Sequence, residues 1–309
     1  MNQTIFLMLG LLGLVGIGSL VSSNDDDHAP EAEPVDPRMT DGNPIEGTAD
    51  ADDITGTEDG DTIESLGGDD TVNGGAGDDG ITTGEGDDQV DGGFGDDLIY
   101  TGGGEDSVTA DAGDDEIYLG YDDDVYGAET SGVDTGNDTI DGGMGDDTIT
   151  TGLGNHSITG GEGDDSITDN GGTVHIDGED DDDLILSADD SDAEAPDTLL
   201  GGEGRDTIHA GANDIVDGGD GRDTYMLGSA TAGAADIIYD REDTITITLA
   251  DGYAGAGEYT LRQDGDHVQV LLDGNAVAVL RDTQVNQVGT INVVTPKKKK
   301  KPKGAGFPQ

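Results

Sequence analysis

The sequence contains no cysteine and no tryptophan, and only 4% of its 309 residues are aromatic. Without cysteine the chain has no disulfide bonds, which is consistent with a metal ion taking the role of a cross-link, and its redox compartment stays undetermined. So few aromatic residues among so many acidic ones are typical of a disordered acidic polymer. Composition alone therefore favours disorder, unless a regular pattern overrides it.

Positive charge is also scarce. Twelve Lys and Arg residues stand against 71 Asp and Glu residues, which gives a formal net charge of −59, and every Lys lies in the tail after Pro296. Because such a strongly negative field repels phosphate, nucleic-acid binding by the body of the chain is excluded as a function class.

Glycine and aspartate are abundant, and they recur with a period of nine residues. The clearest run reads GGAGDDGIT, TGEGDDQVD and GGFGDDLI over residues 74–99, and the same frame extends from Gly47 to Met226. Five-residue interruptions fall at 128–132 and 187–191. The eighth position of each unit is aliphatic, with Tyr126 and Tyr225 as the exceptions. Self-similarity at a constant spacing is typical of a stacked repeat architecture.

Each unit combines a turn with a short strand. Glycines such as Gly93 and Gly95 permit tight turns, and the three residues that end a unit, for example Leu98, Ile99 and Tyr100, are β-formers. The pattern predicts that two units make one flattened coil. Coils stacked about 4.8 Å apart would pair their strands in parallel and bury the eighth-position side chains.

The sixth position carries Asp in all but two of the units, and stacking would place these carboxylates in columns. Two carboxylates about 5 Å apart repel by roughly 1 kcal/mol in water and by more in a partly dry turn. Ca²⁺ accepts six to eight oxygen ligands from carboxylates and turn carbonyls, so the pattern predicts calcium between the turns. The predicted metal ligands are Asp52, Asp61, Asp70, Asp79, Asp88, Asp97, Asp106, Asp115, Asp124, Asp138, Asp147, Asp165, Asp183, Asp197, Asp206, Asp214 and Asp223.

Six units match the motif GGxGxD without departure, at 74–79, 92–97, 142–147, 160–165, 201–206 and 218–223. In these units the chain resembles the RTX, or haemolysin-type, calcium-binding nonapeptide repeats. The resemblance covers residues 47–226. It implies an all-β parallel β-roll with calcium ions held between adjacent turns, in a protein that folds outside the cell.

Two units depart from the sixth-position Asp, at His156 and Val174. They are separated by one intact unit, so if alternate units occupy alternate faces, both lie on the same face. One column of sites should be interrupted there, and the opposite column, with Asp147, Asp165 and Asp183, should remain. The unit 119–127 has Val125 and Tyr126 where one aliphatic residue is expected, which predicts a local break in the roll.

The segments before the repeats have a different composition. Residues Ile5 to Val21 form an uncharged apolar run, at the short limit for crossing a bilayer, so residues 1–23 are predicted to be an export or membrane-anchoring segment. Residues 24–46 are rich in acid and proline, which is typical of a linker.

After the repeats, residues 227–296 show alternating strands and a hairpin centred on Asp273 and Gly274. They predict a small antiparallel β domain that caps the roll. The polybasic tail, 297–309, contains Lys297 to Lys301, which is either a solvated tail or a contact to an anionic surface.

Enzyme motifs are scarce. The sequence has no His-Glu-x-x-His, no Gly-x-Ser-x-Gly and no complete EF-hand loop, and only 46 residues precede the repeats. The favoured function is a secreted or cell-surface structural module that folds on binding calcium and is not an enzyme. The alternatives are an adhesin or matrix protein that binds through residues 227–296, and a hydrolase hidden in that segment.

Overall fold

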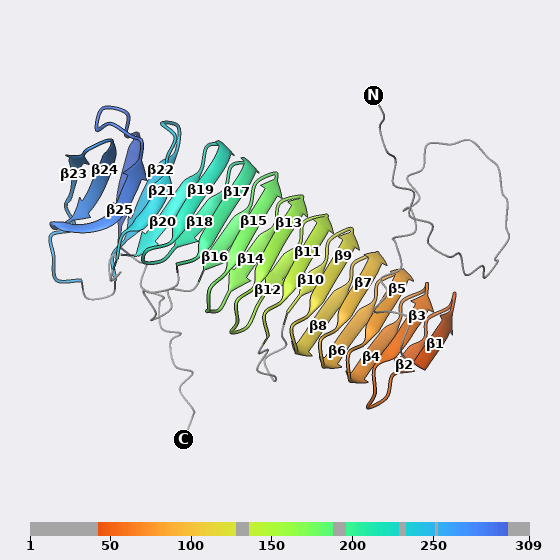
Figure 1. The fold of residues 1–309 in the computed structure, drawn as a ribbon. Coiled ribbons are helices and arrows are strands. Elements are labelled where there is room, and N and C mark those ends of the chain that lie inside the picture. Colours follow the sequence, from red (N-terminus) through yellow and green to blue (C-terminus); the bar gives the residue numbers. More distant parts are fainter. Residues whose placement is uncertain (1–42, 128–135, 188–195, 229–232, 251–252, 296–309) are drawn as a thin grey trace, which may run out of the picture. The chain divides into compact units, whose positions relative to one another are not determined.

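A computed structural model describes residues 43–127, 136–187, 196–228, 233–250 and 253–295 (Figure 1). These residues belong to a compact unit that spans Asp36–Gln309. The apolar run Ile5 to Val21 and the tail 297–309 lie outside the described residues, so both remain predictions. Within the described ranges, no helix is long and apolar enough to span a bilayer.

The described residues form two sheets, and most of the pairing within them is parallel. Sheet A has fourteen strands, in the spatial order β1 (Asn43–Thr48), β3 (Asp61–Leu66), β5 (Gly80–Glu85), β7 (Leu98–Gly103), β9 (Glu116–Tyr121), β11 (Thr139–Met144), β13 (Ser157–Glu162), β15 (His175–Asp180), β17 (Thr198–Gly204), β19 (Ile215–Gly221), β21 (Ala235–Ile238), β25 (Asn275–Arg281), β24 (His267–Leu272) and β23 (Tyr259–Asp264).

Sheet B has twelve strands, in the order β2 (Asp53–Thr55), β4 (Thr71–Ala76), β6 (Gln89–Phe94), β8 (Ser107–Ala112), β10 (Val125–Tyr126), β12 (Thr148–Thr150), β14 (Ser166–Asp169), β16 (Leu184–Ser187), β18 (Thr207–Ala210), β20 (Thr224–Gly228), β22 (Thr244–Thr248) and β26 (Thr290–Val294).

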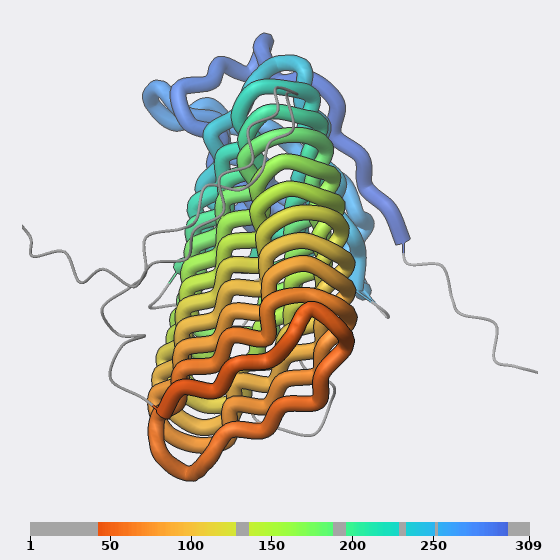
Figure 2. The backbone as a smooth tube through the Cα atoms, turned by 90° about the vertical axis from the view of Figure 1, so that its right-hand side faces the viewer, coloured from red at the N-terminus to blue at the C-terminus, as the bar shows by residue number. Residues whose placement is uncertain are grey.

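Successive units alternate between the two sheets, so two units make one coil, as the period predicts (Figure 2). The register places eighth-position residues beside one another: Ile63 pairs with Ile81 and Ile81 with Ile99 in sheet A. All three are 0% exposed. Burying one such side chain contributes roughly 1.5–3 kcal/mol, so the stacked aliphatic columns supply the core that no single unit has. The predicted all-β parallel roll is confirmed.

Most strands are longer than the three residues that the pattern predicts; β2 and β12 have three residues and β10 has two. β7 runs from Leu98 to Gly103, because parallel pairing continues through the first glycines of the next unit, where Gly102 pairs with Gly84 and with Gly120. The glycines thus take part in the sheets as well as in the turns.

The predicted break at 119–127 is wrong. β10 pairs in parallel with β8 on one side and with β12 on the other, and Tyr126 fills the inward eighth position at 1% exposure. Val125 points outward, at 45% exposure. The aromatic ring replaces an aliphatic side chain without interrupting the stack, and β9 still pairs in parallel with β11, the next described strand of sheet A.

The end of the chain is partly as predicted. The hairpin is confirmed: β24 and β25 pair antiparallel around Asp273 and Gly274, and β23 adds antiparallel to β24, so sheet A ends in an antiparallel cap. The segments that form β21, β22 and β26 were also expected to belong to an antiparallel domain, and this is wrong. β21, β22, β25 and β26 all add in parallel to the roll, which therefore continues past Met226.

Candidate metal centre

The turns of the roll lie on two sides. We call the turns that lead from sheet A to sheet B the AB side, and those that lead from sheet B to sheet A the BA side. The sixth-position residue stands at the end of each turn. On the AB side these residues are Asp52, Asp70, Asp88, Asp106, Asp124, Asp147, Asp165, Asp183, Asp206 and Asp223. On the BA side they are Asp61, Asp79, Asp97, Asp115, Asp138, His156, Val174, Asp197 and Asp214.

The predicted columns of carboxylates are present on both sides. Every predicted ligand except the half-buried Asp52 is at most 5% exposed. A sixth-position Asp donates its backbone N–H to Oδ1 of the Asp one coil later, at 2.8 Å from Asp70 to Asp88 and at 2.8 Å from Asp79 to Asp97. The side chains are therefore drawn inward by backbone donors and form two hydrogen-bonded ladders.

We call each sixth-position residue of a ladder a rung. The second carboxylate oxygen of most rungs has no such donor. This oxygen, Oδ2, is buried and has no hydrogen-bond partner within the described part of the chain at Asp70, Asp79, Asp88, Asp97, Asp106, Asp124, Asp147, Asp165, Asp183, Asp206 and Asp223. A buried charged oxygen without a partner is costly, so at each of these positions the ionised carboxylate needs a compensating positive charge.

Where the first position of the unit is a glycine, that glycine leaves room beside this oxygen; this is so at Asp79, Asp97, Asp147, Asp165, Asp183, Asp206 and Asp223. At Asp70, Asp88, Asp106 and Asp124 the first position is Ser65, Thr83, Thr101 and Leu119. A Cβ built on Gly74 would lie 2.6 Å from Oδ2 of Asp79 and 2.5 Å from the carbonyl oxygen of Gly92, one coil later. A Cβ built on Gly142 would likewise lie 2.5 Å from Oδ2 of Asp147. The side-chain oxygen and a backbone oxygen of the next turn thus face the same small space, which only glycine leaves empty.

The electrostatics of the ladders oppose ionisation in the absence of a cation. Burial, with a further contribution from neighbouring carboxylates, raises the pKa of Asp97 and Asp183 to about 8 and that of Asp165 to about 7. The backbone N–H donors act in the opposite direction but do not offset the burial. The fold thus holds these carboxylates where their charged form needs compensation.

These residues fit calcium. No group of three or more His, Asp or Glu side chains gathers as a metal site in the described ranges, so a site must combine carboxylates with backbone carbonyls. Oxygen-only donors of this kind suit a hard cation of flexible coordination such as Ca²⁺. The open Oδ2 atoms and the glycine-lined space beside them are where the chain offers such donors.

The departures at His156 and Val174 both lie on the BA side, before β13 and β15, as predicted from the alternation of units. His156 takes the place of a carboxylate in the ladder: its Nδ1 accepts the backbone N–H of Asp138 at 3.2 Å, and the imidazole is buried. On the AB side the ladder continues through Asp147, Asp165 and Asp183 without interruption.

Not every predicted ligand has an open Oδ2. At the first rungs, the backbone N–H groups of Thr48 and Thr57 donate to Oδ2 of Asp52 and Asp61, both at 2.6 Å. Oδ2 of Asp197 and Oδ2 of Asp214 also accept hydrogen bonds from the protein. The sequence pattern could not distinguish these four carboxylates from those with an open Oδ2, because the donors lie outside the sixth position.

One rung was missed from sequence. Asp243 is 2% exposed and accepts the backbone N–H of Asp223 at 3.3 Å, so it continues the AB ladder. Its signal was the tripeptide Asp-Thr-Ile at 243–245, which repeats that at 206–208, although the glycines before it are lost.

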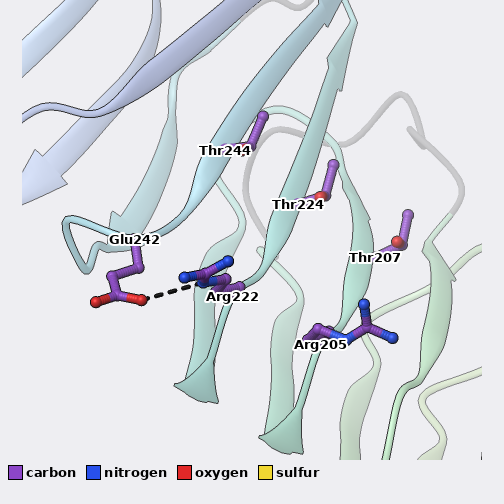
Figure 3. Close-up of a pocket in the computed structure, with 6 residues that line it drawn as sticks. All are labelled: Arg205, Thr207, Arg222, Thr224, Glu242 and Thr244. Atoms are coloured by element: carbon purple, nitrogen blue, oxygen red, sulfur yellow. Dashed lines mark hydrogen bonds and ion pairs between the residues drawn. The ribbon is translucent and has the colours of Figure 1, made fainter.

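The outer residues of the last AB turns also change character. Arg205 and Arg222 occupy the fifth position, where the AB turns from Asp69 to Asp182 have Asp or Glu. With Glu242 and three threonines they line a shallow polar pocket (Figure 3). Both arginines are paired with acids, Arg205 with Asp182 and Arg222 with Glu242, so they balance local charge.

Comparison with known families agrees with this geometry. The family described as RTX calcium-binding nonapeptide repeat (4 copies) matches residues 46–81, 82–117, 100–129, 133–155, 159–193 and 194–225, which together exceed half of the chain. Among curated proteins, none is similar enough to match.

Proposed function

The chain belongs to the family of RTX calcium-binding nonapeptide repeat proteins, and on this premise we propose that it is a structural module, outside the cell or on its surface, whose roll folds when calcium binds. The observation that carries the proposal is the series of buried Oδ2 atoms along both sides of the roll for which the described residues provide no hydrogen-bond donor. Bound calcium would supply the positive charge that these oxygens lack.

A location outside the cell agrees with the energetics of weak calcium binding. Extracellular calcium modules typically bind at about 10⁻⁴ to 10⁻³ M, so a site at tenfold excess of calcium contributes roughly 1.4 kcal/mol to folding. Because each coil contacts only its neighbours, many weak sites add along the stack. A chain of this kind would stay unfolded at low calcium and fold where calcium is millimolar.

The test is a calcium titration of the full chain. We expect the far-UV circular dichroism spectrum to change cooperatively from disordered to β-type as calcium is added, and EDTA to reverse the change. Magnesium at the same concentration serves as control, because Mg²⁺ demands a more rigid octahedral site and keeps its water. A chain that is fully ordered in EDTA at low ionic strength, and gains nothing from calcium, would contradict the proposal.

A second candidate is an adhesin or matrix protein that uses the roll as a spacer and the C-terminal cap to bind a partner. It is favoured by β23, the outermost strand of sheet A, in which five of six residues are exposed. Glycan and cell-surface binding by the calcium-loaded full chain, compared with the variant Tyr259→Ala, tests it. Binding that is absent, or that the substitution leaves unchanged, would leave the structural module as the function.

A further inference from the structure

The two sides of the roll differ most in its second half, where the BA side is irregular and the AB side is regular. The interruption at 128–132 and that at 187–191 both fall between a strand of sheet B and the next strand of sheet A, on the BA side. The unit that contains Asp214 is one residue short, and its turn also lies on the BA side. The complete motifs at 142–147, 160–165, 201–206 and 218–223 all lie on the AB side.

The first irregular BA turns are closed by side chains. In the unit that contains His156 the first position is Thr151, where some other BA units have a glycine such as Gly74 or Gly92. The hydroxyl of Thr151 donates to Oδ1 of Asp169 at 2.9 Å. The carbonyl oxygen of Thr151 accepts from the Asn170 amide at 2.7 Å. Oδ2 of Asp169 accepts the backbone N–H of Gly171 at 3.0 Å. At this turn, side chains thus occupy the space that Gly74 and Gly92 leave open beside Oδ2 of Asp79 and Asp97, and the Thr151 carbonyl is already hydrogen-bonded.

The two remaining BA carboxylates are satisfied at both oxygens. Oδ1 of Asp197 accepts the backbone N–H of Val174 at 2.9 Å, and its Oδ2 accepts the hydroxyl of Ser187 at 2.5 Å. Oδ1 of Asp214 accepts the N–H of Asp197 at 3.3 Å, and its Oδ2 accepts the N–H of Gly211 at 2.6 Å. One coil later the sixth position is Ala235, which has no donor oxygen in its side chain.

The AB carboxylates of the same coils are different. Asp165, Asp183 and Asp206 are each at most 2% exposed, and each keeps a buried Oδ2 without a hydrogen-bond partner in the described structure. Each also has a motif glycine, for example Gly160 beside Asp165, whose missing Cβ leaves space next to that oxygen.

From these contacts we propose that calcium in the second half of the roll is confined to the AB side, and that from His156 to Ala235 the chain's own groups replace calcium on the BA side. The inference rests on the proposed function, since it assigns sites within it. Asp197 and Asp214, which the repeat pattern predicts as ligands, are then structural acceptors. The assignment is made for the second half of the roll, where the two sides differ in the open Oδ2 atoms of their carboxylates.

The test compares carboxylates of the same coil. Asp206→Asn on the AB side and Asp214→Asn on the BA side remove the same charge from buried rungs eight residues apart, and Asp183→Asn with Asp197→Asn form a second pair in case one variant does not fold. The readout is the number of calcium ions per chain at saturation, measured by native mass spectrometry and by flow dialysis on the full chain.

We expect Asp206→Asn and Asp183→Asn to bind at least one ion fewer than the unaltered chain, and Asp214→Asn and Asp197→Asn to bind the same number. Loss of an ion in either BA variant would overturn the inference, as would an unchanged number in both AB variants. An unaltered chain that binds no calcium would instead overturn the proposed function, so the two failures are distinguishable.

Discussion

At the scale of the residue, one position carries the chemistry of this molecule. A sixth-position Asp uses one oxygen to join its coil to the previous one through a backbone N–H. On most rungs the other oxygen has no donor among the residues that the structure describes. The same side chain is therefore a hydrogen-bonding element of the fold and, in the proposed function, a ligand for calcium. Neighbouring fifth-position acids, such as Asp164, are exposed and bond only across the outer turn.

This distinction predicts unequal effects of equal charge changes. Asp147→Asn and Asp165→Asn should each raise the calcium concentration at the folding midpoint, because each removes an open oxygen, with a loss of roughly 1.4 kcal/mol per site at tenfold excess calcium. Asp59→Asn and Asp220→Asn remove the same charge from exposed positions off the ladder and should shift the midpoint far less. Circular dichroism at stepped calcium concentrations measures the shifts, and equal shifts would show that bulk charge governs folding.

At the scale of the element, the turn and the strand share their glycines. Gly74 lies in β4, yet its missing Cβ leaves the space beside Oδ2 of Asp79. The sequence predicted the coil, the alternation of sides and the inward column, because each follows from a period of nine with an apolar eighth position. It did not predict the coils after Met226, where Ala235 replaces the repeat Asp and the glycine motif is lost, so only pairing in three dimensions reveals that the stack continues.

The shared glycine can be tested by adding one methyl group. Gly74→Ala places a Cβ against two oxygens at 2.5 and 2.6 Å, so it should destabilise the calcium-loaded roll by about 1–3 kcal/mol, as overpacking does, and raise the calcium midpoint. Gly103→Ala is the control, since its Cβ would meet only the Glu85 side chain, at 3.6 Å, and its effect should stay within about 0.5 kcal/mol. Urea unfolding in saturating calcium measures both, and a Gly74→Ala variant as stable as the control would show that this space is not needed.

At the scale of the whole molecule, charge repulsion and core burial act against each other. The aliphatic columns favour the compact roll, whereas 71 acidic residues against 12 basic ones oppose it. The sequence predicted this conflict, and it predicted calcium as the ion that would resolve it, but it could not tell open carboxylates from satisfied ones. Ser187 and Gly211 donate to Asp197 and Asp214 from positions that the repeat does not specify, so only the folded turns distinguish them.

The same conflict predicts that acid partly replaces calcium. Burial raises the pKa of Asp124 to about 8, that of Asp223 to about 7 and that of Asp206 to about 6, above the ordinary 3.8 that applies in the unfolded chain. Between these values the metal-free roll binds more protons than the unfolded chain, so its stability falls as pH rises from about 4 to about 8. In EDTA, lowering the pH from 8 to 5 should therefore increase the β-type circular dichroism signal.

Adding 0.5 M NaCl at pH 8 is the control. Salt screens exposed charges but does not relieve the cost of burying a carboxylate, so it should produce the smaller gain in that signal. A larger gain from salt than from acid would mean that surface repulsion, rather than the buried ladders, keeps the metal-free chain unfolded.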